Sequence, residues 1–141
     1  MTLSEFKELT KVNFTNEKLL NQAFIHRSFI NENPRSGLEH NQRLEFLGDA
    51  VLELIVTEFL YTKYPHHNEG DLTSYRSALV NAVTLGEVAS SLQFNDMLKL
   101  SKGEAKDVSR ARSSILADAY EAFVGALYLD QGYESANDFI T

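Results

Sequence analysis

Apolar residues recur at helical spacing through the stretch from Gln42 to Tyr61, which contains no proline. Residues three, four and seven positions apart share one side of an α-helix. One side of this stretch gathers Leu44, Leu47, Val51, Leu54 and Ile55, and a separate line roughly opposite holds Glu45, Asp49, Leu52 and Val56. A helix that is apolar on more than one side is expected at the centre of a fold.

Two residues of this stretch stand outside its main pattern. Phe46 lies off both lines, and a large aromatic side chain away from the core is a candidate for contact with another chain. A glycine such as Gly48 in a helix interior costs about 1 kcal/mol relative to alanine. We therefore expect a second backbone to come close at Gly48, beside the acids.

The same spacing predicts further helices on both sides, so the expected fold class is all-α. Thr2 to Glu5 and Thr84 to Glu87 have the form of capping boxes. The expected N-caps are either Thr15 or Asn16 for the second helix, and Asp71 for a later one. The predicted helices cover residues 3–9, 16–29, 42–61, 71–79, 84–92, 113–128 and 136–141, and loops are expected at 31–37, 63–70 and 99–112.

Composition narrows the class of protein. The chain has 141 residues, 43% of them hydrophobic and 23% charged, which suits one globular domain with a proper core. The absence of cysteine excludes disulfides and thiolate zinc sites. The first thirty residues hold several charges and no long apolar run, so neither a signal peptide nor a membrane span is predicted, and a cytoplasmic location is expected.

A second acidic helix is predicted at residues 113–128. Asp118 and Glu121 are three residues apart on one side of it, and Ala117, Ala122 and Gly125 are small enough for close packing against Gly48. Four carboxyls brought together cannot all ionise without a cation, and Mg²⁺ prefers oxygen ligands. The spacing thus indicates either a magnesium site or ordinary solvated helical acids.

Three other groups leave alternatives open. His26 and Arg27 either complement the end of a helix or help to bind substrate. His66 and His67 indicate a solvated turn or, less favourably, a metal cluster. Glu69, at a junction of loop and helix, is either a cap or an acid that approaches the site of Glu45.

The chain is acidic, with a formal net charge of −7, but one segment is basic. Residues 99–112 hold five of the thirteen lysines and arginines. The segment is either a solvated loop or a contact for the phosphate backbone of a nucleic acid, in which Lys102, Lys106 and Arg110 would bind the substrate.

Two long motifs resemble one known family. The run from His40 to Leu52 closely resembles the signature of bacterial ribonuclease III, and the run from Ser114 to Gly125 resembles its second acidic motif. Between and around them, His26-Arg-Ser28, Glu69-Gly-Asp71 and Leu129-Asp-Gln-Gly132 follow in the matching order. The resemblance covers essentially the whole chain, residues 1–141.

The resemblance implies an all-helical endonuclease domain that forms a homodimer. Its members cut double-stranded RNA with Mg²⁺, which Mn²⁺ can replace, and leave 5′-phosphate and 3′-hydroxyl ends with short 3′ overhangs. Processing of ribosomal and other RNA is the implied role.

The family's residues transfer to positions in this chain. Glu45, Asp118 and Glu121 match its metal ligands, Asp49 and Glu121 its catalytic acids, with Asp49 acting through a bound water. Phe46 matches the aromatic that inserts into the partner subunit, and Glu69 matches an acid that contributes to substrate binding or positioning.

Two departures from the family stand out. Gln42 replaces the usual glutamate one turn before Glu45, which leaves its role in substrate or metal binding open. No double-stranded-RNA-binding domain follows, and the last helix is expected to be cut short, so we expect an isolated nuclease domain. A catalytically silent RNA-binding or assembly module is the alternative, but such modules generally lose several acids, whereas all four are kept here.

Overall fold

Helices make up the regular secondary structure of the computed structural model, which describes residues 1–107 and 110–141, with Arg110 described by its backbone alone. The all-α prediction is therefore confirmed. The helices are α1 (Leu3–Thr10), α2 (Glu17–Ala23), α3 (Arg27–Glu32), α4 (Gln42–Lys63), α5 (Glu69–Leu79), α6 (Ala82–Ser91), the 3₁₀ turn η1 (Phe94–Asp96), α7 (Lys102–Lys106), α8 (Arg110–Gln131) and α9 (Tyr133–Ile140).

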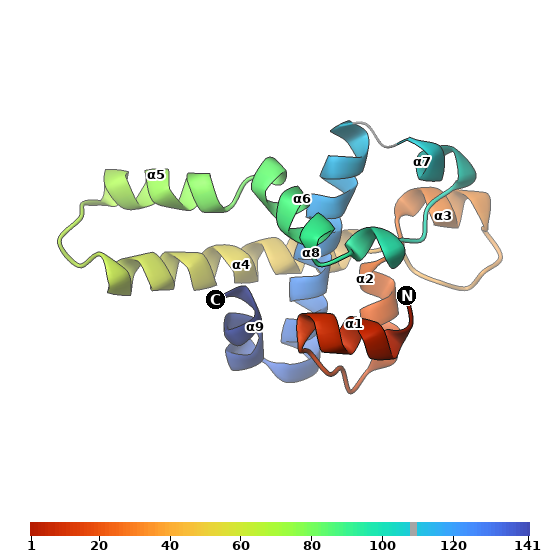
Figure 1. Ribbon diagram of the computed structural model, residues 1–141, viewed down its shortest axis with the longest axis horizontal. Coiled ribbons are helices and arrows are strands. Elements are labelled where there is room, and N and C mark those ends of the chain that lie inside the picture. The colour runs from red at the N-terminus through yellow and green to blue at the C-terminus, as the bar shows by residue number, and fades with distance from the viewer. Residues whose placement is uncertain (108–109) are drawn as a thin grey trace.

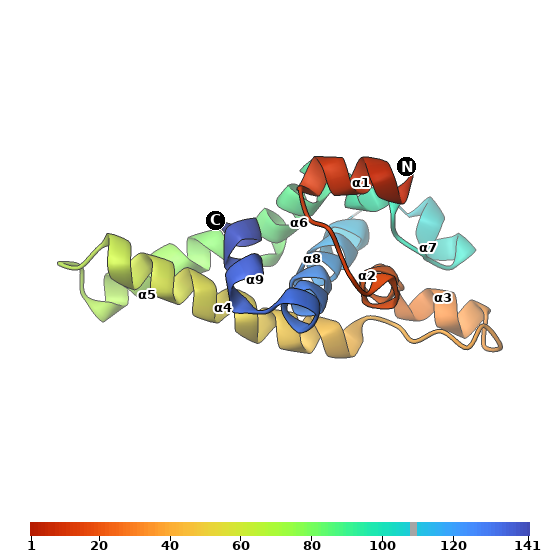
Figure 2. The ribbon, with the colours of Figure 1, turned by 90° about the horizontal axis from the view of Figure 1, so that it is seen from below.

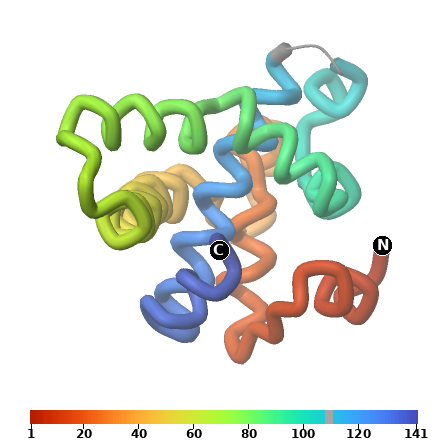
Figure 3. Tube along the Cα trace, turned by 60° about the vertical axis from the view of Figure 1, so that its left-hand side comes forward, coloured from red at the N-terminus to blue at the C-terminus, as the bar shows by residue number. Residues whose placement is uncertain are grey.

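Helices α4 and α8, each of 22 residues, cross at the centre of the molecule (Figures 1 and 2). Helices α2, α6 and α9 pack around α8, which runs through the middle of the fold (Figure 3). The central position predicted for residues 42–61 is confirmed, since α4 buries seven residues: Leu44, Gly48, Val51, Leu52, Ile55, Val56 and Leu60.

Aromatic rings fill the core on the side of α8 away from α4. The ring of Phe123, fully buried on α8, lies 4.8–6.2 Å from the rings of Phe6, Phe14, Phe24, Phe94 and Phe139. Burying an aromatic side chain of this size stabilises a fold by roughly 1.5–3 kcal/mol. This cluster joins the N-terminal helices, η1 and α9 to α8, and so fixes α8 in place.

The second half of α4 and all of α5 project from the body as a two-helix arm (Figure 1). The residues of α5 are exposed or half-buried. Arg76 of α5 donates to the hydroxyl of Thr57 on α4 at 2.9 Å, and the rings of Tyr64 and Tyr75 lie 5.3 Å apart. We refer to residues 57–79 as the arm.

The single helix predicted over residues 16–29 is wrong, because the chain breaks at Phe24 to His26. The backbone of Lys99 donates to Phe24 and accepts from His26, in a parallel bridge centred on Ile25. The carbonyl of Ile25 also accepts from the backbone of Asn41 at 2.9 Å. These partners lie far away in the sequence, so the local apolar spacing could not reveal the break.

Several boundaries differ from the predictions. The caps expected at Asp71 and Thr84 are the third residues of their helices, whose N–H groups donate to the side chains of Asn68 and Asn81. Residues 102–106 form α7, capped by Ser101, inside the predicted loop 99–112. Leu54, expected in the core, is 57% exposed on the face of α4 that carries Phe46. The capping box of Thr2 with Glu5 is confirmed.

Within the described residues, no helix has both the length and the apolar character that crossing a membrane requires.

Candidate active site

The four acids meet where α4 and α8 cross. Gly48 of α4 and Gly125 of α8 let the two backbones touch, since a Cβ built on Gly48 would overlap the carbonyl oxygen of Glu121 and lie 2.9 Å from the nitrogen of Gly125. A Cβ on Gly125 would in turn overlap the carbonyl oxygen of Leu44. The predicted close approach at Gly48 is confirmed, and it brings the acidic sides of both helices together.

Glu45 and Asp118 form one carboxyl pair across the crossing. Burial and the nearby charges of Asp118 and Asp49 raise the pKa of Glu45 to about 7. A hydrogen bond between the two side chains favours the proton on Glu45, and burial raises the pKa of Asp118 while this bond holds it down. Of the two carboxyls, Glu45 is therefore the one that keeps a proton more readily.

Glu121 and Asp49 form the second pair. Burial, the charge of Asp49 and a hydrogen bond to its side chain raise the pKa of Glu121 to about 8, and Glu45 and Asp118 add to the effect. The neighbouring acids thus make ionisation of Glu45 and of Glu121 harder. Acids that resist ionisation in this way are typical of sites that receive a cation.

The donor set suits a hard divalent cation. As the side chains stand, the described residues contain no group of three or more His, Asp or Glu placed to hold one metal ion. The acids instead lie as two hydrogen-bonded pairs. Carboxylate oxygens are the ligands that Mg²⁺ prefers, and a cation between the acids would remove the repulsion that raises the pKa values of Glu45 and Glu121. The chemistry of the four residues therefore fits Mg²⁺.

The segment from Phe24 to Glu32 is tied to residues 99–104 beside this crossing. The N–H of Ser101 donates to the hydroxyl of Ser28 at 2.9 Å, and the N–H of Lys102 donates to the carboxylate of Glu32 at 3.1 Å. These bonds place α7 next to α3. Lys102 and Lys106 are exposed on α7, where they can meet a ligand from solvent.

Not every cation of the basic segment is available to a ligand. The guanidinium of Arg112 turns inward and donates to the carbonyls of Glu104 and Ala105 and to the side chain of Asn95. It holds α7 against α8. The side chain of Arg110, predicted to bind substrate, lies outside the described residues.

Gln42 and Phe46 lie where the sequence predicted. Gln42 is the exposed first residue of α4, one turn before Glu45. The side chain of Phe46 is 82% exposed and points away from the core.

Glu69 does not join the acids within one chain. It is exposed at the start of α5, at the tip of the arm, and most of the length of α4 separates it from Glu45 (Figure 1). His66 and His67 are exposed on the preceding turn, as a solvated turn requires. The ring of His67 packs 5.0 Å from Tyr64 and 5.6 Å from Tyr75.

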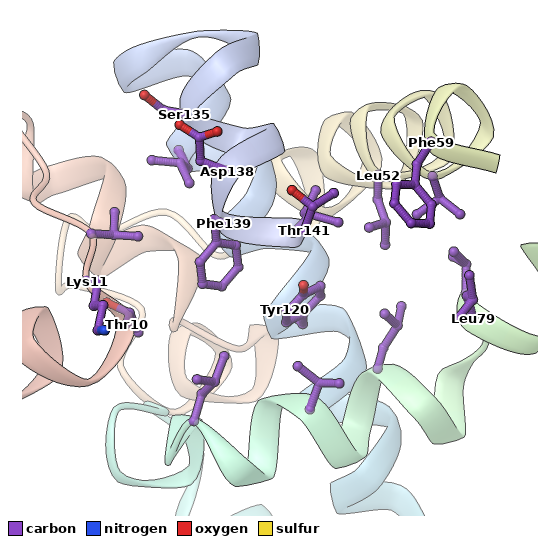
Figure 4. Close-up of a pocket in the computed structure, with 18 of the residues that line it drawn as sticks. Thr10, Lys11, Leu52, Phe59, Leu79, Tyr120, Ser135, Asp138, Phe139 and Thr141 are labelled. Carbon is purple, nitrogen blue, oxygen red and sulfur yellow. The ribbon is translucent and has the colours of Figure 1, made fainter. Parts of the chain in front are cut away.

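Two cavities lie outside the site. One, of about 990 Å³, lies between α4, α6, α8 and α9 and is lined by apolar residues such as Leu52, Leu85 and Phe139 (Figure 4). The other, of about 550 Å³, lies within the arm, between α4 and α5, and is lined by Tyr61, Tyr64 and Arg76 among others. The lining of neither cavity includes the four acids, which lie at the crossing of α4 and α8.

One residue near the site, Asn41, escaped the sequence reasoning, and another, His26, was noticed but expected at a different place in its helix. Asn41 is 4% exposed, and its amide donates to the carbonyl of Ala23 at 2.9 Å, which fixes the start of α4 against α2. His26 was expected near the end of a helix, but it caps the beginning of α3. The spacing of apolar residues cannot reveal a buried amide such as that of Asn41. The His26-Arg-Ser28 motif, in contrast, did point to His26.

Comparison with known sequences gives one consistent family. The family model described as ribonuclease-III-like matches residues 16–141. Ribonuclease 3 of Bacillus velezensis is 52% identical over 136 residues, which are 96% of this chain and 55% of that protein. Ribonuclease 3 of a Geobacillus species is 51% identical over 140 residues, 97% of this chain and 57% of that protein. The chain thus spans little more than half the length of these relatives.

Comparison with solved structures leads to the same family. The nuclease domain of ribonuclease III from Campylobacter jejuni matches with a TM-score of 0.88 at 37% identity, over 98% of this chain and 92% of that chain. Its authors describe structural flexibility in the region of that domain involved in dimer formation. Dicer from Pichia stipitis matches with a TM-score of 0.65 at 31% identity, over 91% of this chain and 53% of that chain.

Proposed function

This chain belongs to the ribonuclease-III-like family, and on that basis we propose that it is the nuclease domain of a metal-dependent endoribonuclease that hydrolyses double-stranded RNA. The observation that carries the proposal is the pairing of Glu45 with Asp118 and of Asp49 with Glu121 at the glycine crossing. Four acids held together without a counter-charge are costly unless a cation uses them.

The acids have distinct roles in the proposed reaction. Glu45, Asp118 and Glu121 hold Mg²⁺, for which Mn²⁺ substitutes because it also takes carboxylate oxygens. When bound, the ion neutralises charge on the phosphodiester and supplies a nucleophile at neutral pH. Asp49 would accept a hydrogen bond from the attacking water and so orient it. The oxygen of this water forms a bond to phosphorus as the bond from phosphorus to the 3′ oxygen breaks. The water gives up one proton to solvent and the 3′ oxygen takes one up, so the ends are a 5′-phosphate and a 3′-hydroxyl.

Contacts with the RNA backbone come from the basic surface beside the acids. The exposed Lys102 and Lys106 of α7 are placed to meet phosphates, and Arg110 continues the basic segment. Gln42 keeps hydrogen-bonding ability at the start of α4, and Glu69 contributes to positioning from the arm. A duplex is the expected substrate because A-form RNA is recognised by its shape, phosphates and 2′-hydroxyls.

The proposed functional unit is a homodimer of this chain. An apolar stripe runs along the outer face of α4 and is defined by Phe46, Ala50, Leu54 and Tyr61. The exposed fraction is 82% for Phe46, 57% for Leu54 and 74% for Tyr61. An apolar stripe of this length on a surface marks a site of association. The related Campylobacter domain has a region involved in dimer formation, which supports a second copy as the partner. The cellular role proposed is processing of ribosomal and messenger RNA in the cytoplasm.

The test is cleavage of a long RNA duplex by this chain with Mg²⁺, with Mn²⁺ and with EDTA. We expect metal-dependent cuts with 5′-phosphate ends. The Glu121→Gln variant should lose activity by about 10²-fold or more, since several kcal/mol of transition-state stabilisation depends on the ion. Glu87→Gln, on the exposed side of α6, is the matched control and should cut normally.

Cleavage that persists in EDTA, or that survives Glu121→Gln, would refute the assignment of the site. Binding of duplex RNA without any cleavage, at low salt and with Gln42→Glu restored as well, would support the silent RNA-binding module.

A further inference from the structure

Arg112 is a half-buried cation in the first turn of α8. The beginning of a helix is the positive end of its dipole, so a positive charge is unfavourable there. The Nε of Arg112 is also buried and has no hydrogen-bond partner among the described residues. Both features cost free energy, so the contacts that the guanidinium does make have to compensate for its inward position.

The guanidinium of Arg112 contacts the end of α7 and the turn η1. Its Nη2 donates to the carbonyls of Glu104 and Ala105, each at 3.0 Å, and its Nη1 donates to the side chain of Asn95 at 2.9 Å. The last four carbonyls of a helix have no partner in the next turn, and a cation is favourable beside them. Arg112 thus donates to two of the last four carbonyls of α7.

Helix α7 depends on such contacts for its position. It has five residues, whereas isolated helices shorter than about 12–15 residues are marginal in water. Its residues are exposed or half-buried, so hydrogen bonds rather than core packing fix it. At its beginning, the N–H groups of Ser101 and Lys102 donate to side chains of α3, beside which α7 lies (Figure 1). At its end, Arg112 provides the connection to α8.

The helix that holds the end of α7 also carries two of the acids. Asp118 and Glu121 follow Arg112 on α8 by six and nine residues, which corresponds to about 9 and about 14 Å along the helix axis. The exposed cations Lys102 and Lys106 lie on α7. Arg112 therefore couples the position of these cations to the position of the acids through one continuous helix.

We propose that Arg112 is a positioning residue for the RNA, which makes no phosphate contact of its own but fixes α7 so that Lys102 and Lys106 keep a set distance from the acids. The proposal rests on the proposed function, in which these two lysines meet the RNA backbone. It divides the basic segment 99–112 into cations that bind phosphate and a cation that places them.

The first test needs neither metal nor RNA. Arg112→Met keeps an unbranched stem and removes every donor, Arg112→Gln is a second variant, and either one that unfolds cooperatively can be used. NMR order parameters of the α7 amides should fall from about 0.85 to below about 0.6, while those around Asp118 stay unchanged. Lys18→Gln, which removes an exposed charge from α2, is the control and should leave α7 rigid. Unchanged order parameters of α7 without Arg112 would overturn the proposal.

The second test is binding of an RNA duplex in EDTA at a series of salt concentrations. Arg112→Met should weaken binding about tenfold and reduce the slope of log K against log salt by about 1–2, because the lysines lose their phosphates. Added to a variant with alanine at both Lys102 and Lys106, it should change neither quantity further, since it acts through them. A further loss there would reveal a direct phosphate contact of Arg112, and an affinity equal to that of the parent protein would reveal a role in the fold alone. Either result would overturn the proposal.

The positioning role and the proposed function fail in different ways. A parent protein that binds no duplex RNA even at low salt would count against the proposed function, whatever the order parameters of α7 show. A parent protein that binds and cleaves duplex RNA, with an α7 that stays rigid in Arg112→Met, would count against the positioning role alone.

Discussion

At the scale of single residues, the metal-free site is a source of instability that depends on pH. The pKa values of Glu45 and Glu121 lie at about 7 and about 8 in the fold, against a usual value of 4.5. A raised pKa means that the protonated acid favours the folded state. This stabilisation is complete below about pH 4.5, declines as the pH rises, and is gone above pH 7 to 8.

We therefore predict that the metal-free protein becomes less stable between pH 5 and pH 8, by about 1–3 kcal/mol after allowance for solvent screening. Thermal unfolding at a series of pH values in EDTA measures this. Glu121→Gln should flatten the dependence and be more stable than the parent protein at pH 8, because an amide has no charge to bury. Mg²⁺ should restore stability to the parent protein at pH 8 and not to the variant. A parent curve that rises with pH would contradict the raised pKa values.

At the scale of helices, the crossing of α4 and α8 depends on the absence of a side chain at Gly48. We predict that Gly48→Ala lowers the free energy of unfolding by about 3 kcal/mol, at the upper end of overpacking, because the new Cβ overlaps the carbonyl oxygen of Glu121. Urea unfolding checks the value. Gly103→Ala is the control: its nearest neighbour would be the hydroxyl of Ser101 at 4.0 Å, and alanine in a helix is favoured by up to about 1 kcal/mol. Equal effects of the two changes would refute the role of Gly48.

The helices show why some of the fold was predictable and some was not. The crossing could be predicted because a glycine stands beside the acids in each helix, Gly48 in one and Gly125 in the other. The break at Ile25 could not, because it is made by the backbone of Lys99 and by Asn41, which no local spacing reports. The pairing of the acids could not be predicted either. The spacing in the sequence shows which acids lie on the same side of a helix, but it does not show which acid of one helix hydrogen-bonds to which acid of the other.

At the scale of the whole molecule, we predict that Phe46→Asp converts a homodimer to a monomer. A charge placed in the apolar stripe would have to be buried without a partner on association. Sedimentation velocity measures the change. Glu87→Gln again serves as a surface control and should leave the mass unchanged, and a parent protein that is monomeric at micromolar concentration would contradict the dimer.

The charge distribution predicts the affinity of this chain for duplex RNA and the salt dependence of that affinity. With a net charge of −7 and five of its thirteen lysines and arginines at residues 99–112, it should bind duplex RNA weakly and with strong dependence on salt. Replacing Lys102 and Lys106 by alanine together should reduce the slope of log K against log salt by about 2, one for each lost phosphate contact. Binding at nanomolar Kd at physiological salt, or an unchanged slope in the double variant, would refute this surface.

The glycine crossing also decides when the acids come together during folding. Gly48 and Gly125 lie on helices far apart in the chain, so their contact requires closure of a long loop, and contacts of this kind tend to form late. Amide protons at the crossing should then exchange with solvent only through global unfolding. A nascent chain would therefore not hold the four acids together before the whole domain has folded, and the proposed cleavage of RNA would begin only then.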